Sequence, residues 1–114
     1  MRTRTGARWT FPKGGREPGE TLAEAAAREA IEEAGAAGRV VGDALGEYRY
    51  RGDVVAAFLL VVEDDRLDAE PGRDPTWLDP ETARSRLAEG RDRAFAAQME
   101  RVLRAAERAA GRVL

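Results

Sequence analysis

Three closely spaced carboxylates constrain this chain more than any other feature of its sequence. Glu29, Glu32 and Glu33 follow an i, i+3, i+4 spacing, which places side chains on one face of a helix. Like charges at this spacing repel each other, so a segment needed only as a stable helix would separate them or pair them with bases. A divalent cation removes the repulsion, and oxygen ligands of this kind suit Mg²⁺ or Mn²⁺. The segment therefore predicts a helix that carries a metal site.

Local signals predict where this helix begins and ends. Thr21 followed three residues later by Glu24 is a capping-box pattern, and Gly35 is typical of the residue just after a helix. The alanine-rich segment between them predicts a helix over residues 22 to 34. Small side chains such as Ala25 lie on the acidic side, so we expect a neighbouring loop or sheet to enclose the carboxylates in part. Partial burial of unpaired carboxylates is unfavourable without a cation.

Composition excludes several classes of protein. The chain has 114 residues and contains neither cysteine nor histidine, which fits one domain and excludes disulfides, Cys/His zinc sites, cysteine nucleophiles and Ser-His-Asp triads. Catalysis must rest on carboxylates, Lys, Arg, Tyr or a metal. There is no apolar run of membrane-spanning length and no signal-peptide core, so we expect a cytoplasmic protein without membrane contact. Interleaved aromatics typical of a nucleic-acid surface are also absent, so we expect no nucleic-acid polymer as partner.

Basic residues precede the acidic helix. The first acidic residue is Glu17, and a basic segment leading into a carboxylate cluster fits a polyphosphate held by metal on one side and by guanidinium groups on the other. For the first few residues, a solvated and disordered basic terminus is an equal alternative. The basic residues of this segment are Arg2, Arg4, Arg8, Lys13 and Arg16.

Periodicity predicts a single α/β unit over residues 1 to 114. Residues 54 to 62 form a continuous apolar run rich in β-branched residues, which favours a buried central strand that pairs with residues 44 to 50 across a turn at 51 to 53. Asp79 and Pro80 predict the start of a helix through residue 88, and an apolar stripe predicts a last helix over residues 93 to 110. Further short strands are expected at residues 8 to 11, 39 to 41 and 76 to 78.

The segment from residue 14 to residue 36 resembles the signature of the Nudix hydrolases. The two positions that usually carry a larger aliphatic residue hold Ala30 and Ala36, which suggests tighter packing. The resemblance implies a Nudix-type α/β/α sandwich with a mixed sheet. All seven fixed positions of the family pattern are present: Gly14, Glu20, Arg28, Glu29, Glu32, Glu33 and Gly35.

The resemblance also implies a reaction and a role for each motif residue. In this family Mg²⁺ or Mn²⁺ is held against a diphosphate linkage while water attacks phosphorus. The matching metal ligands are Glu29, Glu33 and the backbone carbonyl of Lys13, and Glu32 is the matching base for the water. The residues whose expected role is to shape the loop and orient the ligating glutamates are Glu20, Arg28 and Gly14.

The segment just before the motif resembles one branch of the family. Residues 8 to 14 look like the strand and turn of Nudix proteins that hydrolyse diadenosine polyphosphates or diphosphoinositol polyphosphates. In that branch an arginine before the tryptophan contacts phosphates, and Arg4 matches it. Arg49 and Arg51 alternate to the same face of a strand, so together with Lys13 they could bind a small-molecule polyphosphate. An exposed hairpin edge explains the two arginines equally well.

One departure from the family concerns the amino terminus. Nudix domains ordinarily have one or more strands before the tryptophan-containing strand, whereas only eight residues precede Trp9 here. Three explanations compete: a start site assigned too late, a shortened domain that pairs its edges in a dimer, and a remnant that binds ligand without turnover. We expect a homodimer through an exposed sheet edge. A non-catalytic Nudix-fold ligand-binding or assembly module is the alternative function, and an acidic helix that only binds a partner would have no metal affinity.

Overall fold

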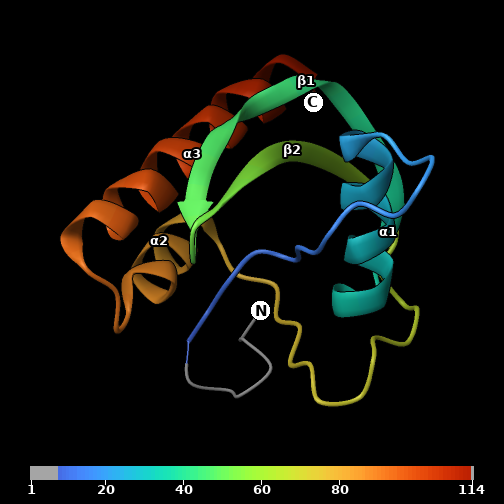
Figure 1. Ribbon diagram of the computed structural model, residues 1–114, viewed down its shortest axis with the longest axis horizontal. Helices are drawn as coiled ribbons and strands as arrows, with labels where there is room; N and C mark the ends of the chain where they lie inside the picture. The colour runs from blue at the N-terminus through green and yellow to red at the C-terminus, as the bar shows by residue number, and fades with distance from the viewer. Residues whose placement is uncertain (1–7, 114) are drawn as a thin grey trace.

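The computed structural model describes residues 8 to 113, and Arg4 lies outside them. The described chain is an α/β unit, as expected, with helices on both sides of a strand ribbon (Figure 1). Helix α1 ends within three residues of the first strand, so the acidic helix is attached directly to the ribbon. In chain order the elements are α1 (Leu22–Ala34), β1 (Ala37–Tyr50), β2 (Asp53–Asp64), α2 (Pro80–Ala88) and α3 (Arg93–Val113).

The strands β1 and β2 form an antiparallel hairpin. Tyr50 pairs with Asp53 next to the turn, where Arg51 (φ 50°) and Gly52 (φ 85°) both adopt the left-handed conformation. Such a turn matches the right-handed twist of the two strands. The register shifts between Val41 and Gly46, so residues 42 to 45 bulge out of the ladder. The expected hairpin is confirmed.

The expectation of a mixed sheet is wrong for the described part of the chain. There the sheet has only the two strands β1 and β2, which run antiparallel to each other. Residues 76 to 78 form no strand, and the expected strand at residues 8 to 11 is reduced to a bridge at Trp9. Both segments have strand-like composition, but strand formation also needs a neighbour in register.

Strand β2 is an outer strand and not the buried central one that its composition predicts. Over residues 8 to 113 it pairs with β1 alone, and none of its side chains is fully buried. Val54 at its start is 53% exposed. Apolar residues on both faces of a strand indicate that it suits a central position. They do not indicate that the chain supplies a strand for its other edge.

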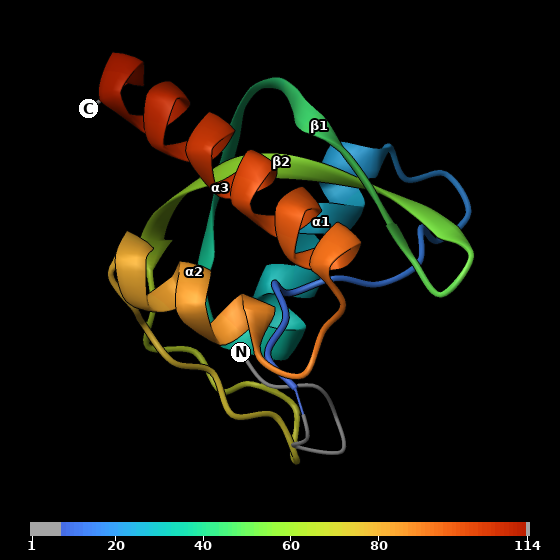
Figure 2. The same ribbon diagram turned by 90° about the vertical axis from the view of Figure 1, so that its left-hand side faces the viewer.

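The helices pack on the ribbon from two sides. Helices α1 and α3 each contact both strands, β1 more than β2, and α3 also packs against α2 (Figures 1 and 2). The apolar stripe of α3 contributes Met99 and Val102 to the core, as predicted, although the helix continues three residues beyond its expected end. No helix in the described range has both the length and the apolar character that a membrane span requires.

The core lies between α3 and the inner face of the hairpin. Trp9, Tyr48, Leu87, Met99 and Val102 form its buried cluster. Phe95 meets the Tyr48 ring edge to face, with the centroids 6.2 Å apart. Because Trp9 belongs to this cluster, the core anchors the segment that leads into the loop before α1.

Candidate active site

Both ends of α1 are fixed by the residues that the sequence predicts. The Thr21 hydroxyl accepts a hydrogen bond from the Glu24 amide at 3.1 Å, and the Thr21 amide donates to the Glu24 carboxylate at 2.8 Å. This reciprocal capping box satisfies two amide groups at the start of the helix. Gly35 ends the helix at a φ of 65°, and a Cβ there would overlap the carbonyl of Leu67. The helix therefore holds its carboxylates at fixed positions.

Glu29 and Glu33 form a buried carboxylate pair on the inner face of α1. Glu29 is 7% exposed and Glu33 is 4% exposed. Burial raises the pKa of the Glu29 carboxyl above its ordinary value, and the hydrogen bond with Glu33 raises this pKa further, whereas Arg28 acts in the opposite direction. Two adjacent buried carboxylates share a proton or bind a cation, because both cannot stay charged at low cost.

The loop before α1 wraps closely around this pair. The Lys13 amide donates to Glu33 Oε1 at 3.1 Å. Gly14 lies directly against the Glu29 carboxylate, so closely that a Cβ on Gly14 would overlap it. Glycine at this position therefore allows the loop backbone to reach the buried carboxylates.

Arg28 joins the loop to the helix. Its Nε and Nη2 donate to the two carboxylate oxygens of Glu20 at 2.7 and 3.0 Å, and Nη2 also donates to the Gly15 carbonyl at 2.8 Å. Nη1 donates to Glu29 at 2.6 Å and to Glu32 at 3.1 Å. This guanidinium holds the pKa of the Glu20 carboxyl below its ordinary value. The contacts are those of a residue that orients the carboxylates around it.

Glu32 differs from its two neighbours. Its side chain is 38% exposed and contacts Arg28, so it lies beside the buried pair and is reached by solvent. Consequently, the part of the chain that the structure describes contains no group of three or more acidic side chains gathered as in a metal site. The donors close together are the carboxylates of Glu29 and Glu33 next to the Lys13 backbone. These hard oxygen donors fit Mg²⁺ or Mn²⁺.

Cationic side chains gather around the Tyr50 ring, near the loop. The distance from the ring centroid is 4.1 Å for Lys13 Nζ, 5.4 Å for Arg51 Cζ and 5.5 Å for Arg91 Cζ. Arg91 also lies 4.4 Å from the Phe95 centroid and donates to the Trp9 carbonyl at 3.2 Å. The sequence prediction included Lys13 and Arg51 but missed Arg91, because this residue stands between two helices without any motif.

Arg49 occupies a different position from Arg51. Its backbone amide donates to Gln98 Oε1 at 2.9 Å, and its carbonyl accepts from Gln98 Nε2 at 3.4 Å, so α3 fixes its backbone while its side chain remains exposed. Arg51 lies in the turn, where its backbone no longer alternates as in a strand. The two arginines therefore do not share a strand face in the way that simple alternation predicts.

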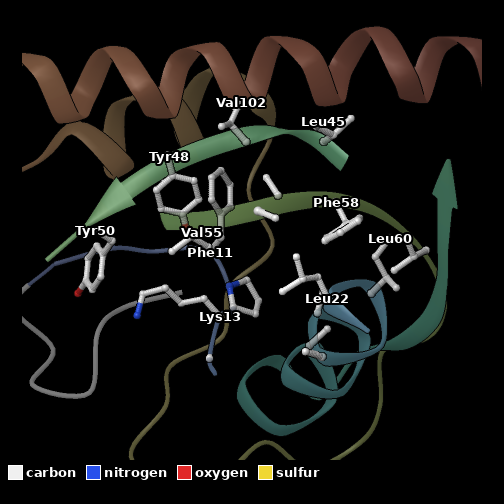
Figure 3. A pocket seen from close by; sticks show the side chains of 18 of the residues that line it. Phe11, Lys13, Leu22, Leu45, Tyr48, Tyr50, Val55, Phe58, Leu60 and Val102 are labelled. Atoms are coloured by element: carbon white, nitrogen blue, oxygen red, sulfur yellow. The ribbon is translucent and has the colours of Figure 1, made fainter. Parts of the chain in front are cut away.

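A cavity of about 600 Å³ lies beside the loop, and no sequence motif predicts it. It extends between α1, the hairpin of β1 and β2, and α3, and Figure 3 shows Lys13 and Tyr50 at one end and Leu60 toward the other. Gly14 and Gly15 form part of its wall, whereas the three motif glutamates do not. Burial raises the pKa of Tyr48 in this wall to about 12, so its phenol stays neutral. The carboxylate pair is therefore not part of the cavity wall, although the loop that contacts it is.

The fold and these contacts define a small α/β protein with a loop-and-helix carboxylate site. Residues 1 to 99 match the NUDIX domain family, and the chain belongs to that family. Over 41 residues it is 58% identical to the mitochondrial Nudix hydrolase 16 of Arabidopsis thaliana and 56% identical to the mitochondrial Nudix hydrolase 13 of the same plant. These stretches cover 36% of this chain in both cases, and 22% and 20% of the two relatives. The chain thus matches about a fifth of the length of each.

Proposed function

We propose that this protein is a Nudix pyrophosphohydrolase that uses Mg²⁺ or Mn²⁺ to cleave a diphosphate linkage by attack of water at phosphorus. The observation that carries the proposal is the buried pair of Glu29 and Glu33, which a loop with Gly14 at its centre encloses. Membership of the Nudix family and the names of the two plant relatives support the same class of reaction. Two adjacent buried carboxylates repel each other, and a metal ion bound between them would remove this repulsion.

Each motif residue has a role in this proposal. Glu29, Glu33 and the Lys13 carbonyl would hold the metal ion, which when bound neutralises charge on the phosphates and lowers the pKa of a bound water. Glu32 accepts the proton of the attacking water, because it is the partly exposed carboxylate next to the buried pair. Arg28 and Glu20 fix the glutamate side chains and the loop in place.

The cations around Tyr50 provide the substrate side of the proposed site. Lys13, Arg51 and Arg91 meet at one ring, and three cations held close together attract a multiply charged anion. We include Arg4 and Arg49 as additional phosphate contacts on the ground of family resemblance alone. The substrate class proposed is therefore a nucleoside or inositol polyphosphate. Arg91 is added to this group because its Cζ lies 5.5 Å from the centroid of the Tyr50 ring.

The test is a screen for metal-dependent phosphate release. Dinucleoside polyphosphates, diphosphoinositols, nucleotide sugars and oxidised nucleotides are each incubated with the chain and Mg²⁺ or Mn²⁺. With the best substrate, Glu32→Gln and Glu33→Gln should each lower kcat by about 100-fold or more, because a base or a ligand is removed. Glu63→Gln, which changes an exposed carboxylate at the end of β2, is the matched control and should keep wild-type activity.

Two results would contradict these assignments. Near-normal turnover by Glu32→Gln or Glu33→Gln at saturating metal would show that the role given to that residue is wrong. Metal binding without turnover of any polyphosphate would favour a non-catalytic binding module. Circular dichroism of each variant checks that the fold is intact, so that loss of activity is not confused with unfolding.

A further inference from the structure

Arg73 is a buried cation in contact with the carboxylate pair, and the sequence pattern does not mark it. It lies in the long segment between β2 and α2, and its side chain is 13% exposed. Its Nη2 lies 3.3 Å from Glu33 Oε2 and 3.5 Å from Glu70 Oε1. Its Nε is buried and has no hydrogen-bond partner among residues 8 to 113. Burial of a guanidinium with an unused donor is costly unless its charge is needed there.

The segment that carries Arg73 is fastened to the end of α1. The Glu70 amide donates to the Glu32 carbonyl at 2.7 Å, and the Leu67 amide donates to the Gly35 carbonyl at 3.1 Å. These two backbone bonds place Arg73 against Glu33 and away from solvent. The contact between Arg73 and Glu33 is therefore part of the fold and not a chance meeting of two mobile surface side chains.

Both carboxylate oxygens of Glu33 have partners within the chain. Oε1 accepts from the Lys13 amide and Oε2 faces Arg73. A metal ion at the Glu29 and Glu33 carboxylates would lie close to a fixed positive charge. At such short range two cations repel strongly, even with dielectric screening by protein and water. Metal and Arg73 therefore compete for Glu33.

We propose that Arg73 is a positioning residue that serves as the counter-ion of Glu33 in the metal-free protein and thereby limits the affinity of the site for metal. The inference rests on the proposed function, since it requires a metal at this carboxylate pair. In the metal-free state Arg73 neutralises a carboxylate that is 4% exposed. Metal binding must break or weaken this ion pair, so part of the binding free energy is spent on displacing Arg73.

Titration calorimetry with MnCl₂ on the full chain tests the proposal. Arg73→Gln should bind Mn²⁺ roughly tenfold more tightly than the wild type, because the competing charge is gone. The same variant should have a lower metal-free Tm, and Mn²⁺ should raise its Tm by more than it raises that of the wild type. Loss of a residue with a purely structural role would weaken metal binding, so the direction of the change is decisive.

The controls separate this inference from the proposed function. Arg66→Gln removes an exposed arginine from the same segment, which pairs with its neighbour Asp64, and should leave Mn²⁺ affinity unchanged. No Mn²⁺ binding by the wild type would overturn the proposed function itself. Wild-type binding with equal or weaker binding by Arg73→Gln would overturn only the role of Arg73. If Arg73→Gln does not fold, Arg73→Met, which removes the charge but keeps an unbranched side chain of similar length, must bind Mn²⁺ more tightly than the wild type.

Discussion

Gly14 and Gly15 are neighbours in the loop but differ in their contacts. A Cβ added to Gly14 would overlap the carboxylate of Glu29, whereas a Cβ added to Gly15 would meet nothing within 4 Å. The atoms that would be struck belong to the end of a flexible side chain, which can move away without unfolding the loop. A larger residue at position 14 should therefore disturb the site more than the fold.

Gly14→Ala should lower the affinity for Mn²⁺ by about tenfold, because displacing a charged ligand by even a small distance weakens its bond to the metal. Its Tm should stay within a few degrees of the wild-type value. Gly15→Ala is the matched control and should change neither quantity. Calorimetric titration and a thermal melt measure both. A large loss of stability in Gly14→Ala with normal metal affinity would mean that the loop backbone, and not Glu29, responds to the added methyl group.

The residues of the site differ in how far the sequence could identify them. Glu29, Glu32 and Glu33 stand in one helix with fixed spacing, so periodicity alone places them together. Arg73 and Arg91 lie in irregular segments, and only the tertiary fold brings them to the loop and the carboxylate pair. The acidic part of the site is therefore predictable from the sequence, whereas much of its basic part is not.

Helix α1 depends on its caps because the rest of the protein covers the helix only in part. Leu22 and Ile31 are 52% and 40% exposed, so apolar burial along this helix is small. The reciprocal hydrogen bonds of Thr21 and Glu24 therefore contribute much of the stability of its first turn.

Thr21→Ala should lower the free energy of unfolding by about 1 kcal/mol, the usual effect of removing a capping hydroxyl. Thr21→Ser keeps the hydroxyl and should remain close to the wild type. Urea denaturation followed by circular dichroism measures both differences. Equal stability of the alanine and wild-type proteins would indicate that the helix starts without this cap.

The helices and the strand ribbon were predictable for different reasons. Caps, prolines and a 3.6-residue period are local signals, and they gave the bounds of α1 and the start of α2 correctly. Sheet order is not local, since a strand such as β2 has the same sequence whether its second edge is covered or free. For residues 8 to 113, the expectation of a mixed sheet and the expectation of a central β2 were therefore wrong for the same reason.

The edge of β2 that has no strand partner among residues 8 to 113 is the feature of the molecule that most affects its solution behaviour. Within residues 8 to 113, β2 has no strand partner other than β1, and side chains of this apolar strand line the cavity. Long apolar edge strands pair readily with other chains. We propose that a second copy covers this edge. In an antiparallel pairing, Arg51 of one copy would lie toward the acidic end at Glu63 and Asp64 of the other, and Asp53 at the start of β2 offsets part of this attraction.

Sedimentation velocity should show a dimer whose population rises with protein concentration. Antiparallel pairing places residue 54 of one copy near the acidic end of β2 in the other. Val54 is 53% exposed, so it tolerates a charged side chain in the monomer. Val54→Asp should therefore shift the protein toward monomer by repulsion, whereas Val54→Lys should keep or strengthen the dimer. A monomer at high concentration would exclude the self-pairing, and equal effects of the two substitutions would exclude the antiparallel arrangement, because only that arrangement brings opposite charges together at both ends.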